Sequence, residues 1–228
     1  GEKSYAAKAG LKTVSEALVR RGIKAKVKYG KWAGSYKVKY QLEAFPKISI
    51  VIPFKDKVEL LKTCMSSIFD KTDYPNLEIL LVDNKSEQAE TLDYLSRYNN
   101  NPIVKVLSYD SEFNYSKINN WAVDQASGEV ILLLNNDIKV ITKKWLKKMY
   151  GFLQQETVGA VGAHLLYDDN TNQHNGLVLG IGGVAGHAFK GMPSHQNHYY
   201  LDGIPRNVSG CTAACLLLRK ETWKAAGG

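Results

Sequence analysis

EVILLLNND, residues 129–137, is an apolar run that ends abruptly in two asparagines and an aspartate. Runs of this kind are typical of strands that a sheet buries on both faces. Three earlier segments have a similar character: ISIVIP (48–53), LEILLVD (77–83) and IVKVLS (103–108). The sequence therefore predicts four strands.

Helical periodicity follows each of these strands. We expect helices over about 58–69, 87–98, 116–126 and 142–154. Four strand–helix repeats in a row predict an α/β fold, with a doubly wound, mainly parallel sheet flanked by helices. Ligands of such sheets bind at the carboxyl ends of the strands, which here are residues 53–56, 83–86 and 135–137.

The first 46 residues differ from the rest in pattern and in charge. Residues 5–21 have helical spacing, and residues 23–29 and 36–40 alternate lysine with apolar side chains, which predicts a hairpin with one lysine face. Residues 1–46 hold 11 Lys/Arg and 3 Asp/Glu, so they carry the whole net charge of +8. This charge suits an anionic partner such as lipid, nucleic acid or an acidic domain, and it equally suits a solvated surface.

The alternation of strands and helices stops after residue 155. Residues 158–167, 177–183 and 212–220 have the pattern of strands, with a polar loop rich in Gly, His, Asn and Tyr between them. We therefore predict a basic appendage over 1–46 and a main domain over 47–228. Within the main domain we assign 47–155 to donor binding and 156–228 to acceptor binding.

Composition excludes several classes of protein. No apolar run approaches the roughly 20 residues of a membrane-spanning helix, and the amino terminus lacks the apolar segment of a signal peptide. Three cysteines, Cys64, Cys211 and Cys215, are too few and too oddly placed for a disulfide framework. We expect a reducing, cytosolic setting.

Two carboxylates stand out at the predicted strand ends. Asp83 could accept hydrogen bonds from a nucleotide base or ribose, and Asp137 could hold Mg²⁺ or Mn²⁺ together with substrate oxygens. Each could equally belong to an ordinary turn. Their occurrence about 50 residues apart, at two strand ends of one sheet, favours a shared site.

The segments ISIVIP, LLVDNKS (80–86), LLLNND (132–137) and GCTAACLLLRKETWKAAGG (210–228) occur in this order. Together they closely resemble family 2 glycosyltransferases of the GT-A fold, and most of all the rhamnosyltransferase-type enzymes of bacterial surface polysaccharide assembly. The resemblance implies transfer of a sugar, with inversion, from a UDP- or dTDP-linked donor to a glycan or lipid-linked acceptor. It also implies Mn²⁺ or Mg²⁺ and other domains of a longer chain. We expect no nucleic-acid partner and a cytoplasmic location, and the basic appendage suggests peripheral contact with the inner face of the membrane.

The resemblance also implies roles for individual residues. Asp137 matches the metal ligand of the family's Asp-x-Asp motif, in which the first aspartate is here Asn135. The residues implied in nucleotide binding are Pro53, Phe54, Asp56, Asp83, Asn119, Asn120 and Asn136. His187 is our choice for the acceptor side. The family's carboxylate base usually follows a Gly-Gly pair, here Gly227-Gly228, so we expect the base beyond Gly228 and assign the role to no residue of this chain.

Two other functions compete with this interpretation. A sugar nucleotidyltransferase would need a glycine-rich loop after the first strand, but PFKDKVEL (53–60) contains no glycine. A non-enzymatic basic binding module would suit residues 1–46 but would leave Asp83 and Asp137 unexplained. Gly180 and Gly182 begin a pattern like a dinucleotide fingerprint, which requires a helix directly afterwards, and glycine and proline follow instead.

Overall fold

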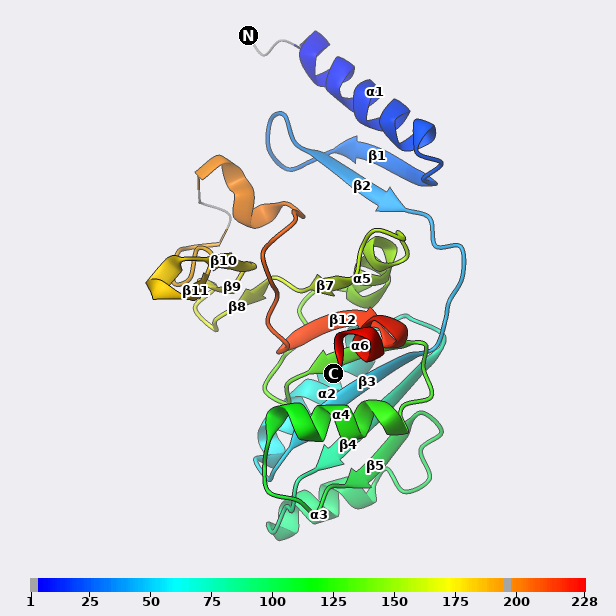
Figure 1. The fold of residues 1–228 in the computed structure, drawn as a ribbon, viewed down its shortest axis with the longest axis vertical. Coiled ribbons are helices and arrows are strands. Elements are labelled where there is room, and N and C mark those ends of the chain that lie inside the picture. The colour runs from blue at the N-terminus through cyan, green and yellow to red at the C-terminus, as the bar shows by residue number, and fades with distance from the viewer. Residues whose placement is uncertain (1–3, 195–197) are drawn as a thin grey trace.

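The computed structural model describes residues 4–194 and 198–228 (Figure 1). Within this part of the chain, the main sheet has six strands in the order β5-β4-β3-β6-β12-β7. Strands β3 to β6 pair in parallel, and β12 runs antiparallel to both of its neighbours. The bounds are β3 Ile48–Phe54, β4 Leu77–Asp83, β5 Val104–Ser108, β6 Val130–Leu134, β7 Ala160–Gly162 and β12 Cys215–Arg219. The four predicted parallel strands are confirmed.

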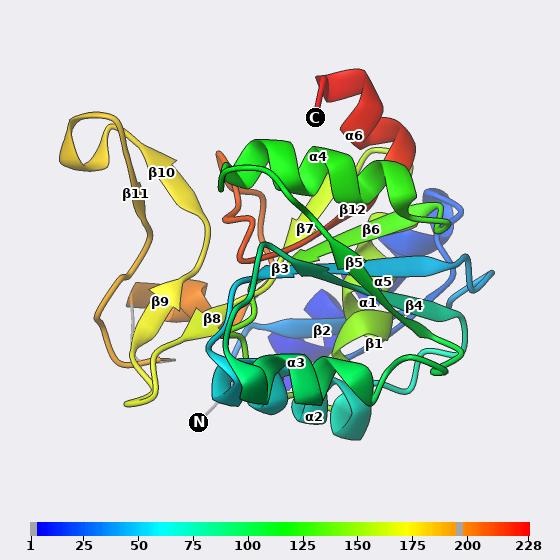
Figure 2. The ribbon, with the colours of Figure 1, turned by 90° about the horizontal axis from the view of Figure 1, so that it is seen from below.

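Helices cover both faces of this sheet (Figure 2). One face is covered by α2 (Val58–Lys71), α3 (Ala89–Ser96) and α5 (Trp145–Leu153), and the other by α4 (Tyr115–Gln125) and α6 (Lys220–Ala226). The helices predicted after the four strands are therefore confirmed. None of the helices in the described ranges is both long and apolar enough to cross a bilayer.

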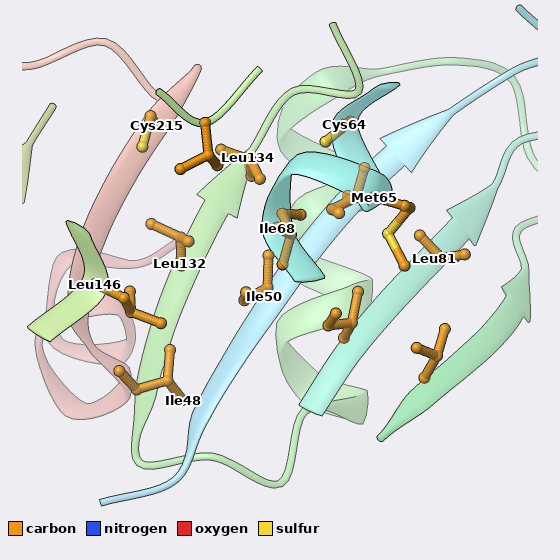
Figure 3. Packing of buried hydrophobic residues seen from close by; sticks show 14 of the residues in the cluster. Ile48, Ile50, Cys64, Met65, Ile68, Leu81, Leu132, Leu134, Leu146 and Cys215 are labelled. Carbon is orange, nitrogen blue, oxygen red and sulfur yellow. The ribbon is translucent and has the colours of Figure 1, made fainter. Parts of the chain in front are cut away.

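Alternate residues of each central strand supply the two cores. Ile48 and Ile50 of β3 face α2 and α5, whereas Val51 faces α4, and all three are fully buried. In Figure 3, Met65 and Ile68 of α2 lie over this first face. Because both faces are packed, a shift of register by one residue would exchange the two cores, so the positions of the strand ends are firmly set.

A buried carboxylate joins the parallel strands near their amino-terminal ends. Glu78 of β4 is 2% exposed. It accepts hydrogen bonds from the Ser49 hydroxyl of β3, from the backbone and hydroxyl of Ser127 before β6, and from Lys105 of β5. Burial alone would raise the pKa of Glu78, but these donors outweigh it and lower the pKa to about 2. One side chain therefore joins all four parallel strands.

The predicted helix and hairpin of the appendage are also confirmed. Helix α1 (Ser4–Arg20) precedes β1 (Ala25–Tyr29) and β2 (Tyr36–Tyr40), which form a separate two-stranded sheet. The Tyr36 hydroxyl reaches under α1 and donates to the Ala7 carbonyl at 3.3 Å. At the other end of β2, the Tyr40 ring meets Phe152 of α5 edge-on, with centroids 5.0 Å apart. The hairpin thus lies between α1 and α5 (Figure 1).

The second half departs from the predicted strands. The expected strand over 158–167 is divided into β7 and β8 (Leu165–Leu166), and the expected strand over 177–183 ends at Leu179. Gly180 and Gly182 have positive φ values of 88° and 66°, which turn the chain into a short 3₁₀ helix, Ile181–Gly183. No helix follows this glycine pattern directly in the described chain, where β11 comes next. The remaining elements are β9 Asn172–His174, β10 Leu177–Leu179, β11 Ala185–His187 and a 3₁₀ helix over His198–Gly203.

The predicted strand over 212–220 is shorter than expected. Residues 211–214 are irregular, β12 occupies Cys215–Arg219, and Lys220 already belongs to α6. The run over 129–137 is likewise a strand only as far as Leu134. β6 thus ends where apolar residues give way to asparagines, and β12 begins only after the small residues Ala213 and Ala214.

Candidate active site

The order of the strands places the site. The chain builds β3, β4 and β5 toward one edge and then returns to add β6 on the other side of β3. Ligands of open α/β sheets bind outside the carboxyl ends of the strands at such a reversal. Pro53 and Phe54 end β3, and Asn135 to Asp137 follow β6, so both predicted segments flank the reversal.

Asp83 ends β4 directly beside this point. In the parallel register it is the partner of Phe54 on one side and of Ser108 on the other. Its Oδ1 atom accepts a hydrogen bond from the Ser86 backbone at 2.9 Å, and the side chain is half-buried. Asp83 therefore makes the turn with one oxygen, and no side chain of the described residues donates to the other. A ligand could use that second oxygen.

Asp56 joins the loop after β3 to the loop after β4. Its Oδ1 atom accepts hydrogen bonds from the backbones of Glu87 and Gln88, at 3.0 and 2.9 Å, just before α3. Its own backbone N–H donates to the Ser86 hydroxyl at 2.8 Å. Asp56 has a left-handed backbone with φ of 48°. The side chain that we predicted at the nucleotide thus also holds the two loops of the site together.

Asn135, Asn136 and Asp137 emerge where β6 ends. Asn135 and Asn136 are half-buried, whereas Asp137 is exposed and forms no hydrogen bond or ion pair with the described residues. The Asn135 backbone is fixed, because its N–H donates to the Ala214 carbonyl at 3.0 Å. Asp137 is therefore an unengaged carboxylate on a well-anchored turn.

Tyr115 is a site residue that sequence reasoning missed. Its hydroxyl lies 3.3 Å from the Ala213 carbonyl and 3.5 Å from Asn135 Oδ1, so it bridges the residues before β12 and those after β6. Burial raises the pKa of Tyr115. The available signal was Asn114, a helix-capping residue type that indeed caps α4 by accepting from the Lys117 backbone at 3.0 Å.

The remaining predicted residues occupy different environments. Phe54 is 5% exposed and belongs to the core, and Pro53 is half-buried. Asn119 is fully buried in α4, and its Nδ2 atom donates to the Tyr115 carbonyl at 2.7 Å. The Asn120 amide lies against Gly228, where any Cβ atom would clash with it. Asn119 and Asn120 each have a buried Oδ1 atom that lacks a hydrogen-bond partner among the described residues.

A divalent metal fits this edge of the sheet if water and the substrate supply most of its ligands. The described residues contain no group of three or more His, Cys, Asp or Glu that could hold a metal by themselves. Mg²⁺ characteristically binds through one or two carboxylates and completes its shell with water and substrate phosphates. Asp137, exposed and without a partner in the described chain, suits that arrangement.

His187 is in contact with a second, buried histidine. His174 is 1% exposed, and its Nε2 atom accepts hydrogen bonds from the backbones of Gly176 and Thr212, at 3.3 and 3.2 Å. Its proton must then lie on Nδ1, which faces His187 Nδ1 at 2.8 Å. Burial, with His187 and His164 nearby, lowers the pKa of His174 to about 4. The pair connects β9, β11 and the residues that lead into β12.

A broad cleft runs along the described part of the molecule. Its volume is about 3180 Å³, and it runs from the junction of the appendage past α5 to the loops of the second half. Asp137, His164 and His174 line it, whereas Pro53 and Asp83 do not. Asp137 therefore lies where the edge of the sheet meets a broad groove.

Known proteins resemble this chain over most of its length. A family model described as Glycosyl transferase family 2 matches residues 49–224. The O-antigen biosynthesis protein RfbC of Myxococcus xanthus is 41% identical over 98% of this chain. An uncharacterized protein, y4gI, of Sinorhizobium fredii is 39% identical over 99% of it. The chain spans only 18% and 25% of the lengths of these two relatives.

Solved structures agree on the fold. GalNAc-T7 with UDP, GalNAc and Mn²⁺ matches with a TM-score of 0.60 at 16% identity, covering 80% of this chain and 36% of that one. TarS 1-349 of S. aureus matches with a TM-score of 0.52 at 18% identity, covering 79% and 49%. The sheet and its helices therefore form a GT-A fold.

Proposed function

This chain belongs to glycosyltransferase family 2, and from that membership we propose that it transfers a sugar from a UDP- or dTDP-linked donor to a glycan or lipid-linked acceptor. We further propose that transfer inverts the anomeric carbon and serves the assembly of a bacterial surface polysaccharide, with rhamnose as one candidate sugar. The O-antigen role of a relative that is 41% identical supports the pathway. Because the chain belongs to this family, we no longer consider it a nucleotidyltransferase or a non-enzymatic binding module.

One observation carries the proposal: Asp83 and Asp137 lie at the ends of the two strands that flank β3. Asp83 would accept a hydrogen bond from the base or ribose through its second oxygen. Pro53 would border the nucleotide, while Asp56 would hold the two adjoining loops in place. Asn119, Asn120 and Asn136 remain proposed neighbours of the nucleotide.

Asp137 would hold Mn²⁺ or Mg²⁺ together with oxygens of the donor diphosphate. The GalNAc-T7 structure contains UDP and Mn²⁺ on the same fold, which supports this choice. When bound, such a metal supplies positive charge that stabilises the departing diphosphate. We propose that the acceptor hydroxyl loses its proton to a carboxylate beyond Gly228. His187 is proposed to border the acceptor, because its pair with His174 fixes the loop that enters β12.

Calorimetric titration of UDP and dTDP in the presence of Mn²⁺ tests the donor site. Asp83→Ala should weaken binding of the preferred nucleotide by about 1–3 kcal/mol, the free energy typical of a lost hydrogen bond to a charged group. Asp124→Ala is the matched control, because Asp124 is an exposed aspartate at the carboxyl end of α4, whereas the candidate site adjoins the amino end of this helix. Equal affinity of a folded Asp83→Ala protein and the control would contradict the role of Asp83.

The metal ligand is tested separately. Mn²⁺ should increase nucleotide affinity in the unmodified chain and have little effect on Asp137→Ala. If Mn²⁺ increased affinity equally in both proteins, Asp137 would not be the ligand. Thermal-shift measurements with a panel of nucleotide sugars would then identify the donor.

A further inference from the structure

One face of the β1–β2 hairpin presents four lysines in two directly opposed pairs. In the antiparallel register Lys26 faces Lys39 and Lys28 faces Lys37, and all four side chains are exposed. We call these four residues the lysine face. Side chains that are directly opposed on an antiparallel pair have Cβ atoms about 4.5–5.5 Å apart, and like charges at that spacing are destabilising.

The described residues supply no ion pair for this face. The two acidic residues that the structure describes in the appendage are engaged with other lysines, because Glu43 pairs with Lys24 at 3.1 Å and Glu16 pairs with Lys12 at 3.7 Å. The positive field extends onto α5, where burial and the charge of Lys37 lower the pKa of Lys148. The repulsion is therefore left uncompensated within this part of the protein.

Packing of the opposite face of the hairpin holds the lysines in place in spite of this repulsion. The Tyr36 hydroxyl is bonded to α1, and the Tyr40 ring packs on Phe152 of α5. The Gln154 side chain also donates to the Gln41 carbonyl at 2.9 Å. These contacts fix the lysine face to the main domain, so the four lysines stay close together.

We propose that the lysine face docks on a membrane surface that contains anionic phospholipid. An aromatic residue at the turn of the hairpin favours a membrane over a purely electrostatic partner. Trp32 lies in this turn, half-buried, with the Lys31 ammonium 5.4 Å from its ring centroid. Trp and Tyr are enriched at the interface between membrane and water, and clusters of basic residues next to them bind anionic headgroups.

Vesicle co-sedimentation of the whole chain, without nucleotide, tests this proposal independently of the donor site. The chain should bind phosphatidylcholine vesicles that contain phosphatidylglycerol, should bind pure phosphatidylcholine weakly, and should dissociate at high salt. Each neutralised lysine should weaken binding about fivefold, so Lys26→Gln/Lys39→Gln should lose about 25-fold. Lys117→Gln/Lys224→Gln removes the same charge from exposed positions on α4 and α6 and should bind almost normally.

A second measurement separates binding from structure. Because Lys26 opposes Lys39 directly, Lys26→Gln/Lys39→Gln should unfold at the same temperature as the unmodified chain or at a higher one. A lower unfolding temperature would show that the lysines serve the fold, which would overturn the proposal. Equal vesicle binding by the two double variants, or no binding to anionic vesicles, would overturn it too. So would preferential binding of a short DNA duplex, since that result would assign the lysine face to nucleic acid.

Discussion

Asp83 and Asp56 are both carboxylates beside neighbouring strand ends, yet they are engaged differently. Asp56 uses one oxygen to accept two backbone hydrogen bonds ahead of α3, whereas Asp83 uses one oxygen for its own turn. Ser86 connects them, because its hydroxyl accepts from the Asp56 backbone while its N–H donates to Asp83. The position of Asp83 is thereby fixed before any ligand arrives, which reduces the entropy that binding must overcome.

Glu78, near the amino-terminal ends of the strands, is likewise a carboxylate held by hydrogen bonds. Its lowered pKa makes the stability of the fold depend on pH. Its folded pKa of about 2 lies below its ordinary value of 4.5. The unfolded chain therefore takes up a proton as the pH falls through 4.5, while the folded chain resists until about pH 2. The resulting stabilisation is complete above pH 4.5 and is lost between pH 4.5 and 2. It amounts to about 3 kcal/mol, because lowering a pKa by one pH unit corresponds to about 1.4 kcal/mol.

Urea unfolding over this pH range tests the prediction. Glu78→Gln should be less stable at neutral pH and should show a flatter dependence of the unfolding free energy between pH 4.5 and 2. Glu156→Gln, which changes an exposed glutamate, should behave like the unmodified chain. An unchanged pH dependence in Glu78→Gln would mean that other carboxylates cause the acid instability.

At the scale of elements, the pattern of side chains predicted the parallel strands and their helices. β3, β4 and β6 are near-continuous apolar runs, and the helices between the strands have apolar residues at helical spacing. The second half resisted prediction because β7, β9, β10 and β11 have only three residues each, and such short strands have no period to detect. Contacts distant in sequence fix them instead, for example the one between His174 and His187.

The residues of the candidate site likewise include some that the sequence pattern predicts and some that it does not. Asp83 and the turn over 135–137 were predictable because each ends a long apolar run. Tyr115 was not, because its role depends on Ala213, which is 98 residues away in the sequence. The second function of Asp56, in joining two loops, likewise depends on a contact with residues 87 and 88 that no local pattern reveals.

The His174–His187 pair gives these short elements a pH dependence of their own. The folded pKa of His174, about 4, lies below its ordinary value of 6.5. The unfolded chain therefore binds a proton between pH 6.5 and 4 that the folded chain excludes, so stability should fall as the pH falls through this window. The loss should reach about 3 kcal/mol at pH 4.

Unfolding free energies at several pH values between 4 and 6.5 check this expectation. His174→Gln should flatten the dependence in this window, because the amide oxygen can still accept from Gly176 or Thr212 but cannot titrate there. Glu78→Gln serves as the control, since it should leave this window unchanged and affect only the lower one. A slope that survived in His174→Gln would assign the effect to another group.

At the scale of the whole molecule, charge and chemistry are separated. The appendage carries the net charge of +8, while residues 47–228 are neutral overall and contain both proposed halves of the site. The proposed donor site lies at the carboxyl ends of β3, β4 and β6, which are among the most thoroughly buried elements. The proposed acceptor side consists of short strands held by side-chain contacts. On this proposal donor binding depends on the rigid part of the fold, and donor binding and sugar transfer should be separable.

The last prediction follows from this separation: residues 1–228 should bind the donor nucleotide but transfer its sugar slowly. Binding draws on Asp83 and Asp137, which are both present. Transfer also needs a base within reach of the acceptor hydroxyl, which we propose lies beyond Gly228, and a general base typically contributes about 10²–10⁴-fold to the rate. A polypeptide extended past Gly228 should therefore bind nucleotide with equal affinity and turn over faster by about that factor.

The comparison uses the same donor, Mn²⁺ and acceptor for both chains, with affinity measured by calorimetry and turnover by release of nucleoside diphosphate. In the extended chain, replacing the first carboxylate after Gly228 by its amide should reduce turnover to the level of residues 1–228 while leaving affinity intact. Because Gly228 lies against Asn120 of α4, the residue that follows it would emerge beside the proposed nucleotide neighbours. Comparable turnover by the two chains would instead place the base within residues 1–228, and His187 would be the first residue to replace.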